Sequence, residues 1–124
     1  MVKGKFHIID NFRNAFSGIS ILVKEGKIFR VHLLIAISVI VAGILFKIEK
    51  HEWLMIILTI GMVLTAEGIN TSLEKLSDYL TPDFDHVIKK VKDIAAAAVL
   101  IASLSAALLG LIIFIPYLAE LIKQ

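Results

Sequence analysis

The sequence contains no cysteine, so a chain of 124 residues has neither a disulfide framework nor a cysteine-based metal site available. It lacks a basic stripe interleaved with aromatic residues, which leaves nucleic-acid binding with little support. It has no glycine-rich phosphate loop of the P-loop kind, and its four histidines show no ligand spacing such as HxxxH. Any nucleotide or metal site must therefore be built from other side chains.

Apolar residues, by contrast, are abundant and clustered. They make up 58% of the chain, the mean hydropathy is +0.88, and three strong runs cover residues 31–46, 53–69 and 94–121. A helix that crosses a bilayer needs about 20 mainly apolar residues. One such run could be a buried helix of a soluble domain, but three in so short a chain predict a membrane protein. We expect an all-α fold in a single domain over residues 1–124, with spans at about 30–48, 53–78 and 92–120.

The basic residues predict how these spans are oriented. Ten of the thirteen lysines and arginines precede the first span or lie between the second and third; the exceptions are Lys47, Lys50 and Lys123. Loops rich in lysine and arginine stay in the cytoplasm. We therefore expect a multi-pass protein of the plasma membrane, with the N-terminus and the second loop inside and the C-terminus outside.

The segment at about residues 6–25 differs from the spans. Its larger apolar residues, such as Ile9, Phe12, Phe16 and Ile19, recur every three or four positions, opposite polar residues. This pattern predicts an amphipathic helix, which either lies in the cytoplasmic membrane interface or caps the bundle.

The third span is rich in alanine, serine and glycine, which let helices approach closely in a membrane. Three spans enclose little interior, so we also expect a homo-oligomer.

Four polar residues follow one another along the second span: Glu67, Asn70, Glu74 and Asp78. At about 100° per residue they fall within an arc of about 80° on one helix face. Carboxylate and amide oxygens suit Mg²⁺. Together with nearby lysines they suit phosphoryl transfer, in which catalysis is mostly positioning and charge neutralisation. The alternative is a salt-bridge network with the lysines, but a carboxylate as deep as Glu67 is expensive to bury and is usually functional.

These residues carry a resemblance to a known family. EGINTSLEKLSD at residues 67–78 matches E-x-x-N-[ST]-x-x-E-x-x-x-D, the signature of the prokaryotic diacylglycerol kinase and undecaprenol kinase family. KDIAAAAVLIA at residues 92–102 resembles its second signature. FRVHLL at 29–34 and NAFSGI at 14–19 match weaker elements in the right order. The first motif is specific, and the resemblance spans nearly the whole chain.

The resemblance implies a homotrimeric membrane enzyme that transfers the γ-phosphoryl group of Mg-ATP to a lipid hydroxyl at the cytoplasmic interface. Glu67 then inherits the role of general base, Glu74 that of metal ligand and Asn70 that of ordering the site. The residues matching positions that hold the nucleotide are Asp78, Lys92 and Asp93.

The chain departs from the family pattern at three positions. A second metal-binding glutamate is usual where this chain has Gly26, and Glu25 lies one residue earlier, so Glu25 is the candidate ligand if the chain bends there. The nucleotide pocket usually has an arginine and a tyrosine where this chain has His7 and Asn14.

Several readings remain open from the sequence. Undecaprenol and diacylglycerol both present one primary hydroxyl, and the short spans with the simple ELIKQ tail favour undecaprenol. The alternatives to a kinase are a non-catalytic membrane subunit and an ion pathway lined by Glu67 and Glu74.

Overall fold

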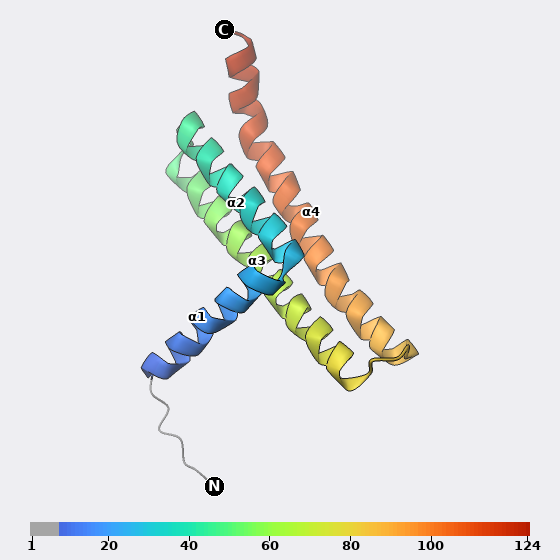
Figure 1. Cartoon of the computed structure of the whole chain (residues 1–124). Coiled ribbons are helices and arrows are strands. Elements are labelled where there is room, and N and C mark those ends of the chain that lie inside the picture. The colour runs from blue at the N-terminus through green and yellow to red at the C-terminus, as the bar shows by residue number, and fades with distance from the viewer. Residues whose placement is uncertain (1–7) are drawn as a thin grey trace.

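The computed structural model describes residues 8–124, and within that range it contains four helices and no strand (Figure 1). The helices are α1 (Ile8–Glu25), α2 (Lys27–Phe46), α3 (Lys50–Leu80) and α4 (His86–Ile122). The last three each contain an apolar window long enough to cross a membrane. The expected all-α fold with three spanning helices is therefore confirmed.

The helices do not stop where the apolar runs stop. α3 has 31 residues and α4 has 37, whereas a span needs about 20. The additional turns carry charged residues, and the backbone hydrogen bonds of a helix can continue into the interface whatever the side chains are. The start of α4 is fixed by Asp85, whose Oδ1 accepts hydrogen bonds from the backbone N–H groups of Val87 and Ile88 at 2.8 and 3.0 Å.

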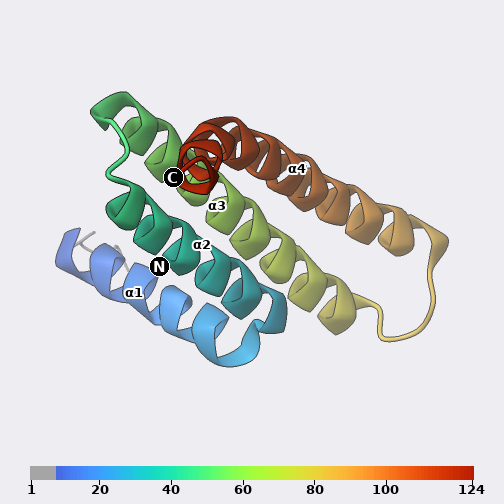
Figure 2. The same cartoon turned by 90° about the horizontal axis from the view of Figure 1, so that it is seen from above.

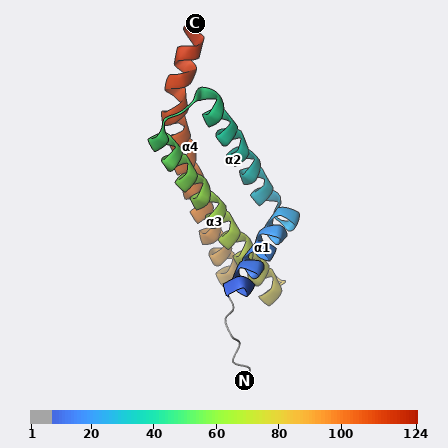
Figure 3. The same ribbon diagram turned by 90° about the vertical axis from the view of Figure 1, so that its left-hand side faces the viewer.

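α3 is the central element, since it packs against both α2 and α4, while α1 packs against α2. Figure 2 shows this order as α1, α2, α3 and α4 side by side, and Figure 3 shows α4 running behind α3. We call the end with the α1–α2 joint and the α3–α4 loop the site end. The opposite end, with the α2–α3 turn and the C-terminus, is the far end (Figure 1).

The joint between α1 and α2 is a single residue, Gly26. Its N–H donates to the carbonyl of Leu22 at 2.8 Å, and its own carbonyl accepts from the N–H of Arg30 at 3.0 Å. A Cβ atom at this position would lie 2.5 Å from the Leu22 oxygen, so the joint requires glycine. The Arg30 guanidinium donates to the carbonyls of Val23 and Lys24, both at 2.9 Å, and so occupies carbonyls that the end of α1 leaves free.

At the far end the three spanning helices are held by close packing. Gly43 lets α2 approach α3, because a Cβ atom there would lie 2.7 Å from Cη2 of Trp53. A buried cluster of Ile48, Ile56 and Ile113 fills the space between the helices. The ring of Phe46 lies 6.1 Å from that of Phe114, which joins α2 to α4.

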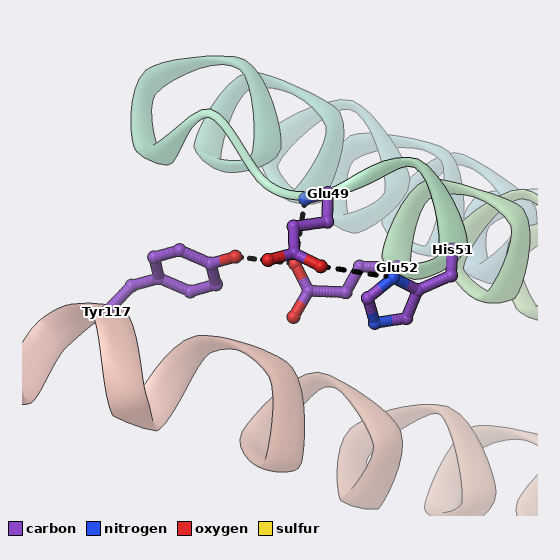
Figure 4. A network of polar contacts seen from close by, with 4 residues as sticks. All are labelled: Glu49, His51, Glu52 and Tyr117. Atoms are coloured by element: carbon purple, nitrogen blue, oxygen red, sulfur yellow. Dashed lines mark hydrogen bonds and ion pairs between the residues drawn. The ribbon is translucent and has the colours of Figure 1, made fainter.

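A polar network ties the beginning of α3 to the last turns of α4 (Figure 4). The Tyr117 hydroxyl donates to Glu52 Oε2 at 2.6 Å, and the same carboxylate oxygen accepts from the N–H of Glu49 at 2.9 Å. The Glu49 carboxylate lies 3.2 Å from Nδ1 of His51. Bonds to a charged acceptor are stronger than neutral ones, so this network fixes the far end of the bundle.

Much of the remaining apolar surface is exposed. Leu45 and Leu58, for example, are 74% and 75% exposed, as expected for side chains that face lipid or further copies of the chain. No residue of α1 is buried, and its Phe12 and Phe16 are open on the surface. Such an uncovered apolar face is available to the membrane interface or to another copy of the chain.

Candidate active site

One side of α3 is buried along the length of the helix, and its chemistry changes from end to end. The buried residues are Ile56, Val63, Glu67, Asn70 and Ser77, at separations of seven, four, three and seven positions. This spacing keeps them on the side that faces the other helices. The first two are apolar and the last three are polar. We call this buried side of α3 the seam. It is apolar toward the far end and polar toward the site end.

Glu67 is the most deeply placed acid, and its side chain is nearly closed off, with 4% of the residue exposed. Its Oε1 accepts a hydrogen bond from the Thr71 hydroxyl at 3.3 Å. The imidazole of His32 on α2 is close enough to interact electrostatically with the carboxylate. A carboxylate kept in so apolar a setting is costly to the fold, which points to a chemical role.

Asn70 and Glu74 form a second pair one turn further along. The Asn70 amide donates from Nδ2 to Glu74 Oε1 at 3.3 Å, while its own Oδ1 is buried without a partner. Buried acceptors nearly always have a partner. The Glu74 carboxylate is exposed. Together they offer a free amide oxygen and a solvent-facing carboxylate on the same stretch of helix.

These two oxygens suit one particular kind of metal binding. Among residues 8–124 no group of three histidine, aspartate or glutamate side chains could enclose an ion. Mg²⁺ is usually held by one or two carboxylates, several waters and substrate phosphates, and not by an all-protein cage. The exposed Glu74 carboxylate, held by Asn70, fits an ion that arrives with a nucleotide.

Glu25 is held by Lys75 of α3, whose ammonium donates to Glu25 Oε2. This hydrogen bond and the positive charge of Lys75 lower the pKa of the Glu25 carboxyl. Because the folded pKa lies below the ordinary value of 4.5, the pair stabilises the fold above that pH. The contribution is lost as the pH falls through the lowered value. The pair anchors the end of α1 beside the turn that carries Glu74.

Two further ion pairs lie where α3 and α4 meet at the site end. Lys92 of α4 donates to Asp78 Oδ1 of α3 at 2.8 Å. Within α4, Lys89 donates to Asp93 Oδ2 at 2.6 Å. All four side chains reach solvent, and surface pairs of this kind contribute little to stability. The Lys92–Asp78 pair lies close enough to Glu74 for Lys92 to interact with its charge, so a charged ligand could exchange with this pair.

The structure thus brings most of the predicted residues to the site end, but not into one cluster. Glu67 and Asn70 lie in the buried seam, whereas Glu74 and Asp78 lie outside it on the same face. Asn14 is an exposed residue of α1. His7 lies outside the described residues.

Sequence reasoning missed three polar side chains at the site. Thr71 follows Glu67 by one helical turn, so its bond could have been found from the spacing. His32 is far from Glu67 in the sequence, and only the packing of α2 against α3 brings its imidazole close to the carboxylate. Ser77 carried no signal, although it is buried with the other polar residues of the seam.

A buried carboxylate at one end of three membrane-length helices defines a small integral membrane protein with a polar site at the bundle end. The sequence model of the family described as prokaryotic diacylglycerol kinase matches residues 13–114. The chain belongs to that family, and it is a lipid kinase, for which ATP is the implied co-substrate. Membership also removes the non-catalytic subunit and the ion pathway as leading interpretations.

Individual relatives agree with the family. Undecaprenol kinase of Bacillus subtilis (strain 168) is 32% identical over 108 residues, covering 87% of this chain and 88% of the relative. Diacylglycerol kinase of Synechocystis sp. is 32% identical over 116 residues, covering 93% of this chain and 66% of the relative. Diacylglycerol kinase of Helicobacter pylori (strain ATCC 700392 / 26695) is 35% identical over 77 residues, covering 62% and 60%.

Proposed function

We propose that this kinase transfers the γ-phosphoryl group of Mg-ATP to the hydroxyl of a membrane lipid alcohol at the cytoplasmic interface. The observation that carries the proposal is the buried Glu67 carboxylate, with the free oxygen of Asn70 and the exposed carboxylate of Glu74 on the next turns of the same helix. Glu67 would act as a base in the buried part of the site, and Glu74 would bind the metal in its solvent-facing part. This arrangement suits a reaction between a lipid and a nucleotide.

Glu67 acts in this proposal as the general base that removes the proton of the lipid hydroxyl. The base must lie within hydrogen-bonding reach of that proton, so the hydroxyl has to enter the protein at the depth of Glu67. The Thr71 hydroxyl holds one carboxylate oxygen at 3.3 Å and leaves the other for the substrate. The imidazole of His32 on α2 is a further polar group close to the Glu67 carboxylate.

Glu74 is the proposed Mg²⁺ ligand, and Asn70 orders it through the 3.3 Å hydrogen bond. When bound, the ion neutralises phosphate charge that develops during transfer. Asp78, Lys92 and Asp93 hold the nucleotide, with Lys92 exchanging its bond to Asp78 for a phosphate oxygen. His7 and Asn14 are proposed to complete the nucleotide pocket.

Glu25 is proposed as a second Mg²⁺ ligand. In the structure its carboxylate is bound by Lys75, so this role requires Lys75 to release it when the metal and nucleotide arrive. Because both side chains are more than half exposed, the exchange involves little burial of charge.

We propose a single domain over residues 1–124, with the N-terminus and the α3–α4 loop in the cytoplasm and the C-terminus outside. The excess of basic residues at the site end supports this orientation. A homotrimer is proposed from the family resemblance, and the exposed apolar surface of α2, α3 and α4 provides area for such contacts.

Undecaprenol is the favoured substrate and diacylglycerol the alternative. The relative named undecaprenol kinase matches this chain over 88% of its own length, whereas the first diacylglycerol kinase matches over 66%.

The test is a γ-labelled ATP assay on the full chain in detergent, with undecaprenol and diacylglycerol offered side by side. We expect Mg²⁺-dependent label in the lipid fraction, with the larger amount in undecaprenyl phosphate. Protein that is folded by its helical content but labels neither alcohol would contradict the proposed function. A preference for diacylglycerol would overturn only the choice of substrate.

A further inference from the structure

The ion pair between Glu25 and Lys75 joins α1 to α3 but is not what holds the two helices together. The residues are fifty positions apart, and the side chains of Glu25 and Lys75 are 57% and 52% exposed. Exposed pairs of this kind contribute little to stability. Leu22 of α1 also lies beside Gly68 of α3, and Arg30 caps the end of α1. The pair is therefore free to break when another charged group arrives.

Lys75 is the one basic residue in an acidic part of the chain. Residues 66–85 contain five acids and a single lysine. Lys75 follows Glu74 directly, and its side chain leaves the helix about 100° around the axis from that of Glu74. Asp78, three positions further along, is the nearest acid for Lys75 on its own helix, but it is paired with Lys92. The Lys75 ammonium turns instead to the end of α1, beside the proposed metal ligand.

Lys92 of α4 is the second ammonium group near Glu74, and it is close enough to interact electrostatically with that carboxylate. Asp78 holds it at 2.8 Å, much as Glu25 holds Lys75. All four of these side chains reach solvent, so each lysine can leave its partner without a charge becoming buried. A triphosphate stays strongly negative even with Mg²⁺ bound, and its transfer requires charge neutralisation. A site that contains so many acids needs more than one lysine for this purpose.

We propose that Lys75 binds a phosphate group of the nucleotide, and that Glu25 positions its ammonium until the nucleotide arrives. This inference rests on the proposed function and adds a contact to it. The ammonium acts as a point charge on the phosphate, as lysine does in other phosphate sites. When Lys75 turns to the phosphate, the Glu25 carboxylate is released and becomes available to the metal. The nucleotide is then held by Lys75 of α3 and by Lys92 of α4.

The first test measures ATP binding to the full chain in detergent with EDTA present, by displacement of a fluorescent ATP analogue. In Lys75→Met we expect the dissociation constant to rise about tenfold, because a hydrogen bond between charged groups is lost. In Glu25→Gln we expect it to fall about twofold to fivefold, because Lys75 no longer has to leave an ion pair. A purely structural pair would instead give the same loss whichever partner is removed.

Two matched variants change the same charges elsewhere. Lys24→Met removes an exposed cation next to Glu25, and Asp83→Asn removes an exposed acid of the α3–α4 loop. Because exposed charges outside the site are screened by salt, both should keep the dissociation constant within about twofold of the wild type. The double variant Glu25→Gln/Lys75→Met should bind ATP as weakly as Lys75→Met, since Glu25 acts through Lys75. Equal weakening by the two single variants, or a Glu25→Gln effect that persists without Lys75, would overturn the proposal.

The second test locates the lysines directly in the wild-type protein. In an ATP acyl phosphate the γ-phosphate carries a biotin acyl group, and a lysine amine close to it attacks the acyl carbonyl, so that an amide forms and ATP leaves. We expect label at Lys75 and Lys92 but not at Lys24, and protection of both by excess ATP. Glu25→Gln should increase the label at Lys75 relative to Lys92. Label at Lys92 without label at Lys75 would contradict the phosphate contact.

Failure of the proposed function would look different. Wild-type protein that takes no label at either lysine and phosphorylates no lipid alcohol refutes the proposed function together with this inference. An active wild type whose ATP affinity is unchanged in Lys75→Met refutes only the role of Lys75. Helical content is recorded for every variant, and the labelling of the wild type decides the question even if Lys75→Met does not fold.

Discussion

Replacing Glu67 by glutamine isolates the proton-accepting role of the buried carboxylate. Glutamine has nearly the same shape, and its amide oxygen can still accept the hydrogen bond that Thr71 makes at 3.3 Å. It carries no charge, so the cost of keeping a carboxylate in a site that is 4% exposed also disappears. We therefore expect the variant to be at least as stable as the wild type.

The expected loss of activity follows from the absence of a substitute base. General base catalysis contributes about 10²–10⁴-fold. The next acid on this face is Glu74, seven residues further on, or about 10 Å along the helix axis, which is too far for the same hydroxyl. At 1.36 kcal/mol per factor of ten, we expect the barrier to rise by about 3–5 kcal/mol.

The assay measures label transferred from γ-labelled ATP to undecaprenol at saturating substrate, with helical content recorded on the same sample. Thr71→Ala is the control: it removes one hydrogen bond to the carboxylate but keeps the base, so its rate should fall much less than that of Glu67→Gln. The lost bond goes to a charged group and is long at 3.3 Å, so we expect a loss of ~1.5 kcal/mol, or about tenfold. Folded Glu67→Gln protein whose turnover stays within tenfold of the wild type would refute the assignment of the base.

Three other changes test other parts of the structure. Glu74→Ala should raise the Mg²⁺ concentration needed for the half-maximal rate by about tenfold or more, as measured by titrating Mg²⁺ at fixed ATP. An unchanged Mg²⁺ requirement would place the ion elsewhere. Lys92→Met should raise the KM for ATP about tenfold, since bonds to charged groups contribute ~1.5–3 kcal/mol, whereas the neighbouring exposed Lys90→Met should not; equal effects would argue against a nucleotide contact. Gly43→Leu should destabilise the bundle by about 1–3 kcal/mol in detergent unfolding, because the new side chain meets Trp53, and wild-type stability would show that the helices separate easily there.

The helices and the acidic face could be predicted from the sequence because both depend on local geometry. Apolar runs of membrane length have few alternatives to a spanning helix. Once α3 is helical, the positions of Glu67, Asn70 and Glu74 relative to one another are fixed by the period of the helix. The spacing alone could not separate the buried from the exposed members, since this depends on how far the neighbouring helices extend along α3.

Contacts between residues far apart in the sequence could not be predicted from it. The pair of Glu25 and Lys75 connects residues fifty positions apart, and the approach of His32 to Glu67 depends on how α2 packs against α3. The apolar pocket between α2, α3 and α4, lined for example by Ala36, Val63 and Gly110, is less predictable still, because it is set by the volume that side chains from three helices leave unfilled. Spacing along one helix carries no information on such volumes.

The departure from the family pattern at Gly26 has a structural consequence that reaches the active site. With the joint as it is, a side chain at position 26 would collide with the Leu22 carbonyl, so a glutamate there requires a different path between α1 and α2. The same joint directs Glu25 to Lys75 and brings Leu22 to within 3.5 Å of where a Cβ atom of Gly68 would lie, next to Glu67 in the sequence. The requirement for glycine at position 26 and the close approach of α1 to α3 therefore both belong to one backbone turn. If Glu25 binds the metal, its carboxylate must first leave Lys75. Leu22 then keeps α1 close to α3, while the Arg30 bonds to Val23 and Lys24 keep α1 joined to α2.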